Sequence, residues 1–359
     1  MRHRPVIAGA GIIGASIAYY LAMNGENPVV LDKAARPAMG ISGASFGWIN
    51  AYNAEDPGYF RFRVNSMDEF MRLQQRLDRR LEINWNGSLV WTHADRQAAE
   101  LVRRLQSWGY PMRRVDGNEI RKLEPNLRHY PDSACFAENE GSVDPVAMTR
   151  ELLTEAVRLG AELRTGCEVL AVKTRGEKVY GIETGHGAME CRDLILAAGR
   201  GSAALAGQVG VDLPATGSEA LLVETQPLQP VISRLLAAPG VRVWQSVEGT
   251  LLACDEFDSC ELAPRSKELS TELLRRAESL LNLPERLQSR RVMVGTRLVP
   301  VDGFPVIGRP ASPAGLYIAV MHSGVTLAPL VGKLAAGEIS SGAVEESLLP
   351  YRPGRPSLC

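Results

Sequence analysis

The chain has 359 residues, 45% of them hydrophobic, so it can bury a large core, and at about 150 residues per domain it is expected to form two domains. Forty lysines and arginines oppose 41 aspartates and glutamates, which leaves a formal charge of -1. This balance excludes the polybasic surface that nucleic-acid binding requires, and it points to a small-molecule partner.

The cysteines are scattered through the chain without a C-x-x-C pair or a nearby histidine cluster. This pattern fits neither a zinc site nor a dense disulfide framework, so no metal site is expected. We interpret the cysteines as reduced thiols in a cytoplasmic protein. They are Cys135, Cys167, Cys191, Cys254, Cys260 and Cys359.

The first 23 residues imitate a signal peptide or a short membrane span, because a basic start precedes a largely apolar run at 6–23. Gly9, Gly11 and Gly14 stand at the front of this run, where they favour a tight turn and would weaken a membrane helix. No small-residue cleavage site follows, and residues 28–32 have the pattern of a buried strand. The sequence therefore predicts a strand, a turn and a helix here, and no membrane span.

The predicted elements begin with a strand at 6–8, a helix at 12–24 and a strand at 29–31, which together form one βαβ unit. A long helix at about 56–81 has one apolar face, with arginine and aspartate on the other. A strand at 87–92, a helix at 96–108 and a helix at 117–124 follow. The apolar face of the long helix comprises Phe60, Val64, Met67, Phe70, Met71, Leu73 and Leu77.

The alternation of helices and strands resumes in the middle of the chain and again at its end. A helix at 145–159 leads into strands at 162–165 and 169–175, a hairpin at 179–184 and 188–192, and a buried strand at 194–199. The block 215–254 is rich in strands, most clearly at 221–223 and 241–245, and indicates a different domain. A helix at 268–281, strands at 291–299 and 316–320 and a helix at 326–339 complete the pattern.

A dinucleotide fingerprint occupies the first βαβ unit. The glycines of Gly9-Ala10-Gly11-Ile12-Ile13-Gly14 directly follow a strand and open a helix, and Asp32 ends the next strand. The first glycine makes the turn, the second lets backbone amides approach a pyrophosphate, and the third lets helix and strand pack closely. The helix N-terminus carries about half a positive charge toward the phosphates. An acid at position 32 accepts hydrogen bonds from ribose hydroxyls and disfavours a 2′-phosphate.

The fingerprint alone does not distinguish FAD from NAD. The small-residue loop 40–47, with Ser42 and Ser45, offers amides and hydroxyls to a second part of a long cofactor. This loop favours FAD, although a plain connector would have a similar composition.

The chain resembles the D-amino-acid oxidase superfamily, in particular its glycine oxidase and sarcosine oxidase branch. The resemblance covers essentially the whole chain and rests on the order and spacing of five pieces. The sequence of the stretch 321–329 is most similar to that of the flavin subunits of opine oxidases and D-hydroxyproline dehydrogenases, which work with other subunits. The pieces are the fingerprint with Asp32, the loop 42–47, the strand 194–199 with Arg200, the stretch 295–308 and the stretch 321–329.

The resemblance implies an α/β fold, with a Rossmann-like FAD-binding domain of the glutathione-reductase type and an α+β substrate domain with a mainly antiparallel sheet. The FAD-binding domain is expected at 1–50, 145–214 and 300–359, and the substrate domain at 51–144 and 215–299. Relatives that attach FAD use a cysteine near the strand that ends at Arg297. Because none occurs between Cys260 and Cys359, the FAD is expected to be noncovalent. The expected FAD contacts are Gly9, Gly11, Ile12, Ile13, Gly14, Asp32, Lys33, Ser42, Ser45, Val169, Ala198, Gly199, Gly324, Val325 and Thr326.

The resemblance also implies the reaction, in which a hydride leaves the carbon beside the nitrogen of a small amino-acid-like amine. Arg297 is expected to grip the substrate carboxylate, because a planar guanidinium suits that task; an internal salt bridge is the alternative. His322 is nominated as a base or as a hydrogen-bond partner of flavin or substrate, and Trp244 as a substrate contact. Amides of the helix near Thr326 are expected to stabilise charge on the reduced flavin.

Three other functions stay open from the sequence. A flavoenzyme of the same fold that oxidises a hydroxy acid would use Arg297 equally well, but would need an obligatory base. An FAD-carrying subunit that relays electrons within a heteromeric complex is the second, and an NAD-only dehydrogenase is the third.

Overall fold

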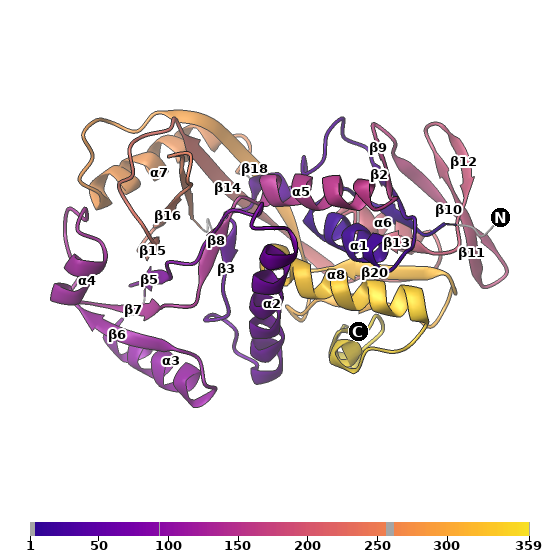
Figure 1. The fold of residues 1–359 in the computed structure, drawn as a ribbon, viewed down its shortest axis with the longest axis horizontal. Helices are drawn as coiled ribbons and strands as arrows, with labels where there is room; N and C mark the ends of the chain where they lie inside the picture. The colour runs from indigo at the N-terminus through magenta and orange to yellow at the C-terminus, as the bar shows by residue number, and fades with distance from the viewer. Residues whose placement is uncertain (1–3, 93, 256–261, 359) are drawn as a thin grey trace.

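The computed structural model describes residues 4–92, 94–255 and 262–358. Figure 1 shows an elongated molecule whose two ends are organised by different sheets. Helices α1 and α6 lie at one end, helices α3, α4 and α7 lie at the other, and α2 stands between them. This α/β arrangement confirms the expected fold class, whereas the exact domain boundaries stay a prediction.

A six-stranded sheet forms the first end, in the order β19-β20-β13-β1-β2-β9. Its strands are parallel except for the edge strand β19. Strands β1, β13, β19 and β20 are buried along their whole length, as expected for a sheet covered on both faces. The bounds are β1 (Val6–Ala8), β2 (Val29–Asp32), β9 (Glu162–Thr165), β13 (Leu194–Leu196), β19 (Val306–Gly308) and β20 (Leu316–Val320).

Three helices from distant parts of the chain pack together beside this sheet. Helix α1 contacts both α5 and α8, and α8 also contacts α2. A three-stranded antiparallel sheet, β10-β11-β12, and the short helix α6 lie at the same end of the molecule (Figure 1). The bounds are α1 (Ile12–Met23), α2 (Pro57–Arg76), α5 (Pro145–Arg158), α6 (Gly201–Gly207), α8 (Gly324–Ser341), β10 (Val169–Arg175), β11 (Lys178–Thr184) and β12 (Gly187–Glu190).

An eight-stranded sheet forms the other end, in the order β18-β14-β17-β16-β15-β5-β7-β6. All of its neighbours are antiparallel except β15 and β5, so the expected mainly antiparallel sheet is confirmed. The bounds are β5 (Ser88–Val90), β6 (Met112–Asp116), β7 (Ser133–Ala137), β14 (Ala215–Thr225), β15 (Leu235–Ala238), β16 (Val241–Gln245), β17 (Leu251–Asp255), β18 (Ser289–Pro300), α3 (Asp95–Ser107), α4 (Gly117–Leu123) and α7 (Ser266–Leu280).

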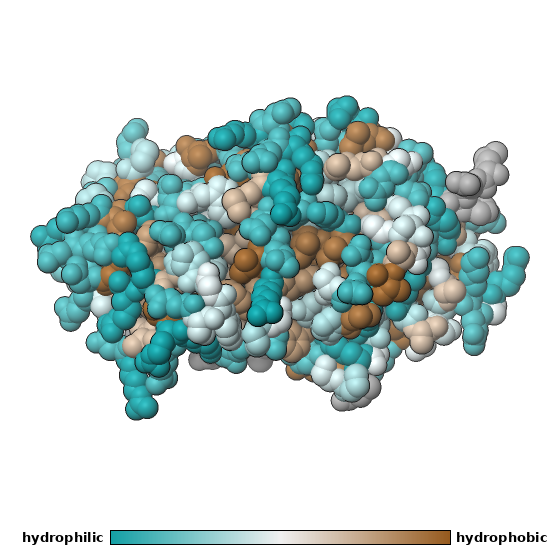
Figure 2. All heavy atoms as spheres, turned by 60° about the horizontal axis from the view of Figure 1, so that its bottom comes forward, coloured by the Kyte–Doolittle hydropathy of each residue, from teal (hydrophilic) through white to brown (hydrophobic). Residues whose placement is uncertain are grey.

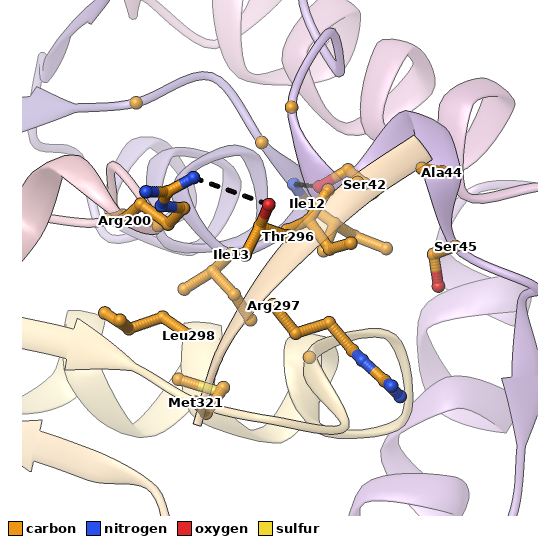
Figure 3. A pocket seen from close by; sticks show the side chains of 18 of the residues that line it. Ile12, Ile13, Ser42, Ala44, Ser45, Arg200, Thr296, Arg297, Leu298 and Met321 are labelled. Carbon is orange, nitrogen blue, oxygen red and sulfur yellow. Dashed lines mark hydrogen bonds between the residues drawn. The ribbon is translucent and has the colours of Figure 1, made fainter. Parts of the chain in front are cut away.

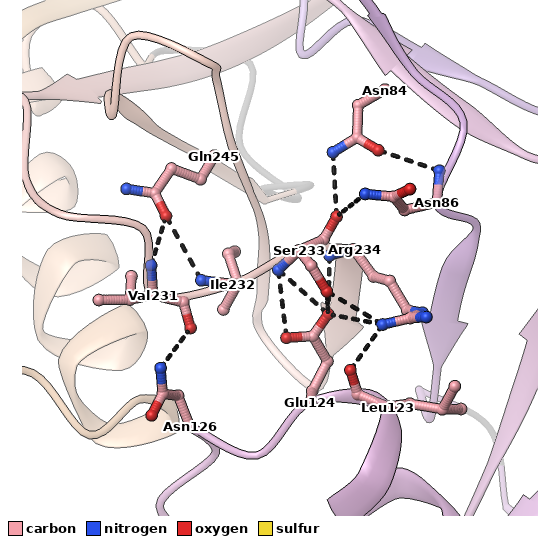
Figure 4. A network of polar contacts seen from close by, with 10 residues as sticks. All are labelled: Asn84, Asn86, Leu123, Glu124, Asn126, Val231, Ile232, Ser233, Arg234 and Gln245. Atoms are coloured by element: carbon pink, nitrogen blue, oxygen red, sulfur yellow. Dashed lines mark hydrogen bonds and ion pairs between the residues drawn. The ribbon is translucent and has the colours of Figure 1, made fainter.

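A polar network fixes the segment that enters β15 (Figure 4). Buried Glu124 accepts hydrogen bonds from the amide of Arg234 at 2.7 Å and from the hydroxyl of Ser233 at 2.8 Å. On the other side, Gln245 Oε1 accepts from the amide of Val231 at 2.7 Å. Burial raises the pKa of Glu124 above its usual value, although these donors oppose the shift. The network joins α4 to the eight-stranded sheet.

Several elements differ from the sequence expectations. Helix α2 ends at Arg76 and not near residue 81, and the apolar-face residue Met71 is 47% exposed. Helix α8 begins at Gly324, two residues before the expected start, after Ser323 in a left-handed conformation with φ of 60°. The strands β6, β7 and β19 were not predicted, nor was the small sheet β3-β8-β4. Its bounds are β3 (Trp48–Ile49), β4 (Ile83–Asn84) and β8 (Gly141–Val143).

The surface in Figure 2 is mostly hydrophilic, with hydrophobic side chains gathered near the middle of the face. None of the helices in the described ranges is long and apolar enough to cross a membrane. The apolar run at 6–23 forms β1, the glycine turn and α1, as predicted.

A buried carboxylate ties three helices together. Glu69 on α2 has no exposed surface, and it accepts hydrogen bonds from Tyr20 Oη at 2.9 Å, Arg76 at 2.7 Å and Lys333 Nζ at 2.9 Å. Burial alone would raise the pKa of Glu69, but the donors outweigh it and hold the pKa below the usual 4.5.

Acid is therefore expected to destabilise the protein partly through Glu69. A carboxyl group with a lowered pKa in the folded state stabilises the fold above its unfolded pKa, and this stabilisation is lost as the pH falls through the folded value. We expect Glu69→Gln to lower the melting temperature at pH 7 and to flatten its decline below pH 4.5. Thermal unfolding from pH 7 to pH 3 measures both, and parallel curves for the two proteins would contradict the assignment.

Candidate active site

A cavity of about 800 Å³ is lined by residues from both large sheets. Its walls combine the turn between β1 and α1, the end of β2, the short helix η1 (Ile41–Ala44), the turn after β13, part of β18 and the segment that leads into α8. These segments are far apart in sequence, so the cavity exists only in the complete fold.

The glycine turn has the close packing that its sequence predicts. Gly9 has φ of +109°, and a Cβ there would lie 2.4 Å from the carbonyl oxygen of Ala197. A Cβ on Gly14 would lie 1.9 Å from the carbonyl oxygen of Gly9, so only glycine lets α1 pack this closely on β1. Gly9 lines the cavity and Gly14 does not; Gly14 lies behind the turn, where it sets the helix position.

Replacing Gly14 with alanine is expected to displace α1 and to weaken nucleotide binding. The added methyl group meets backbone and not a flexible side chain, and overpacking of this kind costs about 1 to 3 kcal/mol of stability. Thermal unfolding and FAD titration of the variant measure the two effects. Gly207→Ala is the control, because a Cβ on Gly207 would meet open space. Gly25→Ala would be a poorer control, because Gly25 has a positive φ that strains alanine. Equal behaviour of the Gly14 and Gly207 variants would contradict the prediction.

Asp32 is held in place at the end of β2 by two backbone amides. Its Oδ2 accepts from the amide of Ala10 at 2.7 Å, and its Oδ1 accepts from the amide of Ala34 at 2.8 Å. Lys33 beside it is exposed and forms an ion pair at 3.8 Å with Glu168. Val169 at the start of β10 completes this corner of the cavity.

Ser42 links η1 to the start of α1. Its Oγ accepts a hydrogen bond from the amide of Ile12 at 3.0 Å, and the absence of a Cβ on Gly11 leaves room for this approach. Ile12, Ile13 and Ser45 also line the cavity. Figure 3 shows Ser42 beside Ile12, with Ser45 farther along the same wall.

The turn after β13 forms the opposite wall. Ala198 and Gly199 both line the cavity; Gly199 has a positive φ, and the amide of Ala198 donates to Ser202 Oγ at 3.0 Å. Arg200, the next residue, donates to Thr296 Oγ1 at 3.4 Å (Figure 3).

The corner with Asp32 and the glycine turn fits the ADP half of a dinucleotide. The turn admits no side chain at Gly9, the start of α1 lines the cavity, and the acid stands at the end of the neighbouring strand. The cavity then continues past η1 to β18 and α8, which leaves room for the second half of an extended cofactor.

The start of α8 lies at the far part of the cavity, where Gly324, Val325 and Thr326 line the wall. The first amides of a helix have no acceptor within the helix and carry the positive end of its dipole. The Thr326 hydroxyl is already used, because it donates to the carbonyl of Trp48 at 3.1 Å and accepts from the amide of Asn50 at 3.3 Å. The Thr326 hydroxyl therefore has no proton left to donate to a cofactor, whereas the first amides of α8 do.

Arg297 extends from β18 along the cavity wall (Figure 3). Its Nη2 donates to Ser218 Oγ at 2.9 Å, its Nη1 lies 3.4 Å from His322 Nε2, and its buried Nε has no hydrogen-bond partner. Within the described residues, no carboxylate forms an ion pair with Arg297. The internal salt bridge considered from the sequence is therefore absent from this part of the chain.

His322 lies between Arg297 and Ser323. Arginine only donates, so a hydrogen bond at this contact makes Nε2 of His322 the acceptor and favours a neutral imidazole. Its Nδ1 lies 3.4 Å from Ser323 Oγ. The imidazole thus has contacts on both ring nitrogens.

Trp244 does not line the cavity. Its side chain is 3% exposed and belongs to a buried hydrophobic cluster, and its indole N–H donates to the carbonyl of Phe46 at 2.6 Å. Phe46 itself lines the cavity, so Trp244 supports the wall from behind. Trp244, expected from the sequence to contact the substrate, therefore lies outside the cavity lining, within a strand whose last three residues are all buried.

Two residues that the sequence did not single out lie at or behind the same wall. Arg63, which the helical pattern placed on the polar face of α2, is buried and lines the cavity. Glu140 has no exposed surface and anchors the segment that contains Trp48 and Tyr52. The sequence feature that could have pointed to Arg63 was a charged residue within an amphipathic helix. No sequence feature pointed to Glu140.

These features define a dinucleotide-dependent enzyme with a deep cavity that joins a nucleotide-binding sheet to an antiparallel sheet. The model of the FAD-dependent oxidoreductase family DAO matches residues 5–338, so the chain belongs to this family and is an FAD-dependent oxidoreductase.

Relatives match over nearly the full length of the chain. It is 28% identical to one of the subunits of the opine oxidase of Rhizobium meliloti, with 97% of this chain and 96% of the relative covered. It is 27% identical to glycine oxidase of Bacillus licheniformis, with 96% and 95% covered. The solved structure of glycine oxidase from Geobacillus kaustophilus has the same fold, with a TM-score of 0.88, 21% identity and 99% of each chain covered.

Proposed function

We propose that this chain oxidises the CH–NH bond of a small amino-acid-like amine to an imine, with noncovalently bound FAD. The candidate substrates are D-amino acids, N-substituted amino acids, imino acids and opines. Arg297 is the observation that carries the proposal, because it presents a half-buried cation to the cavity with neutral partners only. A relative that is a glycine oxidase and another that belongs to an opine oxidase support the substrate class.

The proposed cofactor contacts run along the cavity in order. The glycine turn, Asp32 and Val169 hold the ADP half, Ser42 and Ser45 face the pyrophosphate and flavin, and the first amides of α8 face the ring. When bound, the flavin supplies the two-electron acceptor for the hydride. Every described residue proposed to contact it, except Gly14, lines the cavity.

The chain's own residues prepare the substrate. Arg297 orients the carboxylate with its planar donors, and His322 keeps the guanidinium in place by accepting a hydrogen bond from Nη1. A nearby guanidinium and burial in the cavity both disfavour an ammonium ion, so they favour the neutral amine from which a hydride can leave. Once the amine is neutral, its oxidation does not require a catalytic base, whereas the oxidation of an alcohol requires one to remove the hydroxyl proton.

This arrangement favours amine oxidation over hydroxy-acid oxidation. An alcohol requires a base, and Nε2 of His322, the candidate base at this wall, already lies 3.4 Å from the Arg297 guanidinium. A role as the flavin-carrying subunit of a heteromeric complex is compatible with amine oxidation, and the opine oxidase relative is itself named as a subunit.

The test is anaerobic bleaching of the flavin absorbance by a panel of substrates. The panel contains D-amino acids, N-alkyl glycines, prolines, opines and matched 2-hydroxy acids. We expect at least one amine class to bleach the purified holoprotein and the hydroxy acids to leave it oxidised. Bleaching by hydroxy acids alone, or by no amine, would overturn the proposal.

A further inference from the structure

Arg63 is a second arginine on the wall of the cavity. It belongs to α2, its exposed fraction is 3%, and its side chain has three hydrogen bonds. Nε donates to the carbonyl of Asn50 at 2.9 Å, Nη2 donates to Asn50 Oδ1 at 2.6 Å, and Nη1 donates to Asn53 Oδ1 at 2.7 Å. All three acceptors are neutral.

The charge of Arg63 has no direct counterion in the described ranges, since no carboxylate there forms an ion pair with it. Its Cζ lies 5.7 Å from the centre of the Tyr59 ring. The buried carboxylate of Glu140 accepts from the amides of Ala51 and Tyr52, so its contacts are made by other donors. A buried cation without a paired anion is unfavourable, and a cavity that it lines is the place where an anion would relieve this.

Arg63 and Arg297 are both connected to the segment 322–326, which leads into α8. Arg63 holds Asn50, whose amide donates to Thr326 in the first turn of α8, and Arg297 contacts His322 just before that turn. The two guanidinium groups come from different elements, α2 and β18, and both line one cavity. A ligand with two anionic groups would therefore find a cation for each of them on the wall of one cavity.

We infer that Arg63 binds a second carboxylate, so that the substrate is an amine with a carboxylate-bearing arm on each side of its nitrogen. This inference rests on the proposed function, because it places the first carboxylate on Arg297. It narrows the substrate class to iminodiacids and N-carboxyalkyl amino acids. Planar guanidinium groups suit both ends, since each offers paired donors to a carboxylate.

The test uses two thioethers that differ by one carboxylate and contain no amine to oxidise. Thiodiacetate has a carboxylate on each side of sulfur, and (methylthio)acetate has one. Titration of the FAD-loaded full chain, followed by flavin absorbance and by calorimetry, gives the dissociation constant of each. We expect thiodiacetate to bind about 10-fold to 100-fold more tightly than (methylthio)acetate, as charge-assisted hydrogen bonds allow.

Arg63→Gln removes the charge and keeps a donor for Asn50. We expect this variant to bind the two thioethers within about 3-fold of each other, with (methylthio)acetate bound as in the wild type. Arg63→Lys keeps the charge without the planar donors and is expected to retain part of the preference. Arg61→Gln, an exposed arginine two residues away on α2, is the matched control and is expected to change neither constant. Thermal unfolding and FAD content show which variants are folded.

Three results would overturn the inference. The first is a wild type that shows no preference for thiodiacetate. The second is an Arg63→Gln variant that binds both ligands equally more weakly. The third is an Arg63→Gln variant that shifts the flavin potential and leaves the preference intact. The last result would assign Arg63 to the flavin. Because binding is measured without turnover, these results are distinct from a failure of amines to bleach the flavin, which would overturn the proposed function instead.

Discussion

Replacing Arg297 with leucine is expected to weaken the binding of carboxylate substrates by more than 100-fold, which corresponds to about 3 kcal/mol. The side chain presents a cation to the cavity with Ser218 and His322 as its neutral partners, and leucine leaves the substrate carboxylate buried without a charge to pair with. The concentration dependence of anaerobic flavin bleaching gives the binding constant, and the plateau gives the rate of the chemical step.

Three further variants separate the role of Arg297 from a general effect of the cavity. Arg297→Lys keeps the charge and loses the planar donors, so it is expected to recover only part of the affinity. Ser218→Ala removes one neutral hydrogen bond and is expected to cost about 1 kcal/mol. Arg200→Leu removes another arginine of the same cavity, on the wall beside Thr296. It tests whether the loss of any positive charge from the cavity weakens carboxylate binding as much as the loss of Arg297. Unchanged carboxylate binding in Arg297→Leu would exclude the assignment.

Replacing Glu140 with alanine is expected to lower the free energy of unfolding by about 3 to 5 kcal/mol, because it leaves several buried donors without an acceptor. Glu140 accepts from Ser88 Oγ at 2.6 Å, from Tyr110 Oη at 2.7 Å and from the indole of Trp48 at 2.9 Å, besides two backbone amides. Burial raises the pKa of this carboxyl group, and the donors act against that shift. Urea unfolding measures the loss.

The same substitution is expected to weaken FAD binding, because Glu140 positions the cavity wall. Trp48 and Tyr52 line the cavity, their rings are stacked with centres 5.1 Å apart, and both have hydrogen bonds to Glu140. Glu140→Gln keeps the shape but turns amide protons toward these donors, so a smaller loss is expected. Unfolding midpoints and FAD affinities equal to those of the wild type would show that Glu140 has no such role.

Much of the nucleotide-binding end could be predicted from the sequence, because its signals are local. The glycine turn, the strand before it and Asp32 after it occupy 27 consecutive positions, 6–32, and each has a direct steric or hydrogen-bonding reason. Helix α5 likewise follows from its apolar face and from Pro145 at its start, and α1 follows from a nearly continuous apolar run that ends before Gly25.

The antiparallel end was harder to predict because its strands are defined by distant partners. The β6 sequence, Met112–Asp116, has two exposed arginines in its middle and lacks a simple alternation, and it becomes a strand by pairing with β7. Arginines of α2 were expected on its polar face, but Arg63 is buried by elements from elsewhere in the chain, as is Glu69, which the sequence did not single out. Their partners are Asn50, Asn53, Tyr20 and Lys333, and sequence periodicity carries no information about such contacts.

The order of strands in the six-stranded sheet has a consequence for biosynthesis. β1 is made early, yet its neighbour β13 lies at 194–196, and β20, which leads into α8, comes only at 316–320. During translation, one edge of β1 therefore stays unpaired until about half of the polypeptide has been produced, and an unpaired strand edge invites association with other chains. The part of the cavity wall formed by the start of α8 cannot form until β20 has docked, so the complete cavity is a late product of folding.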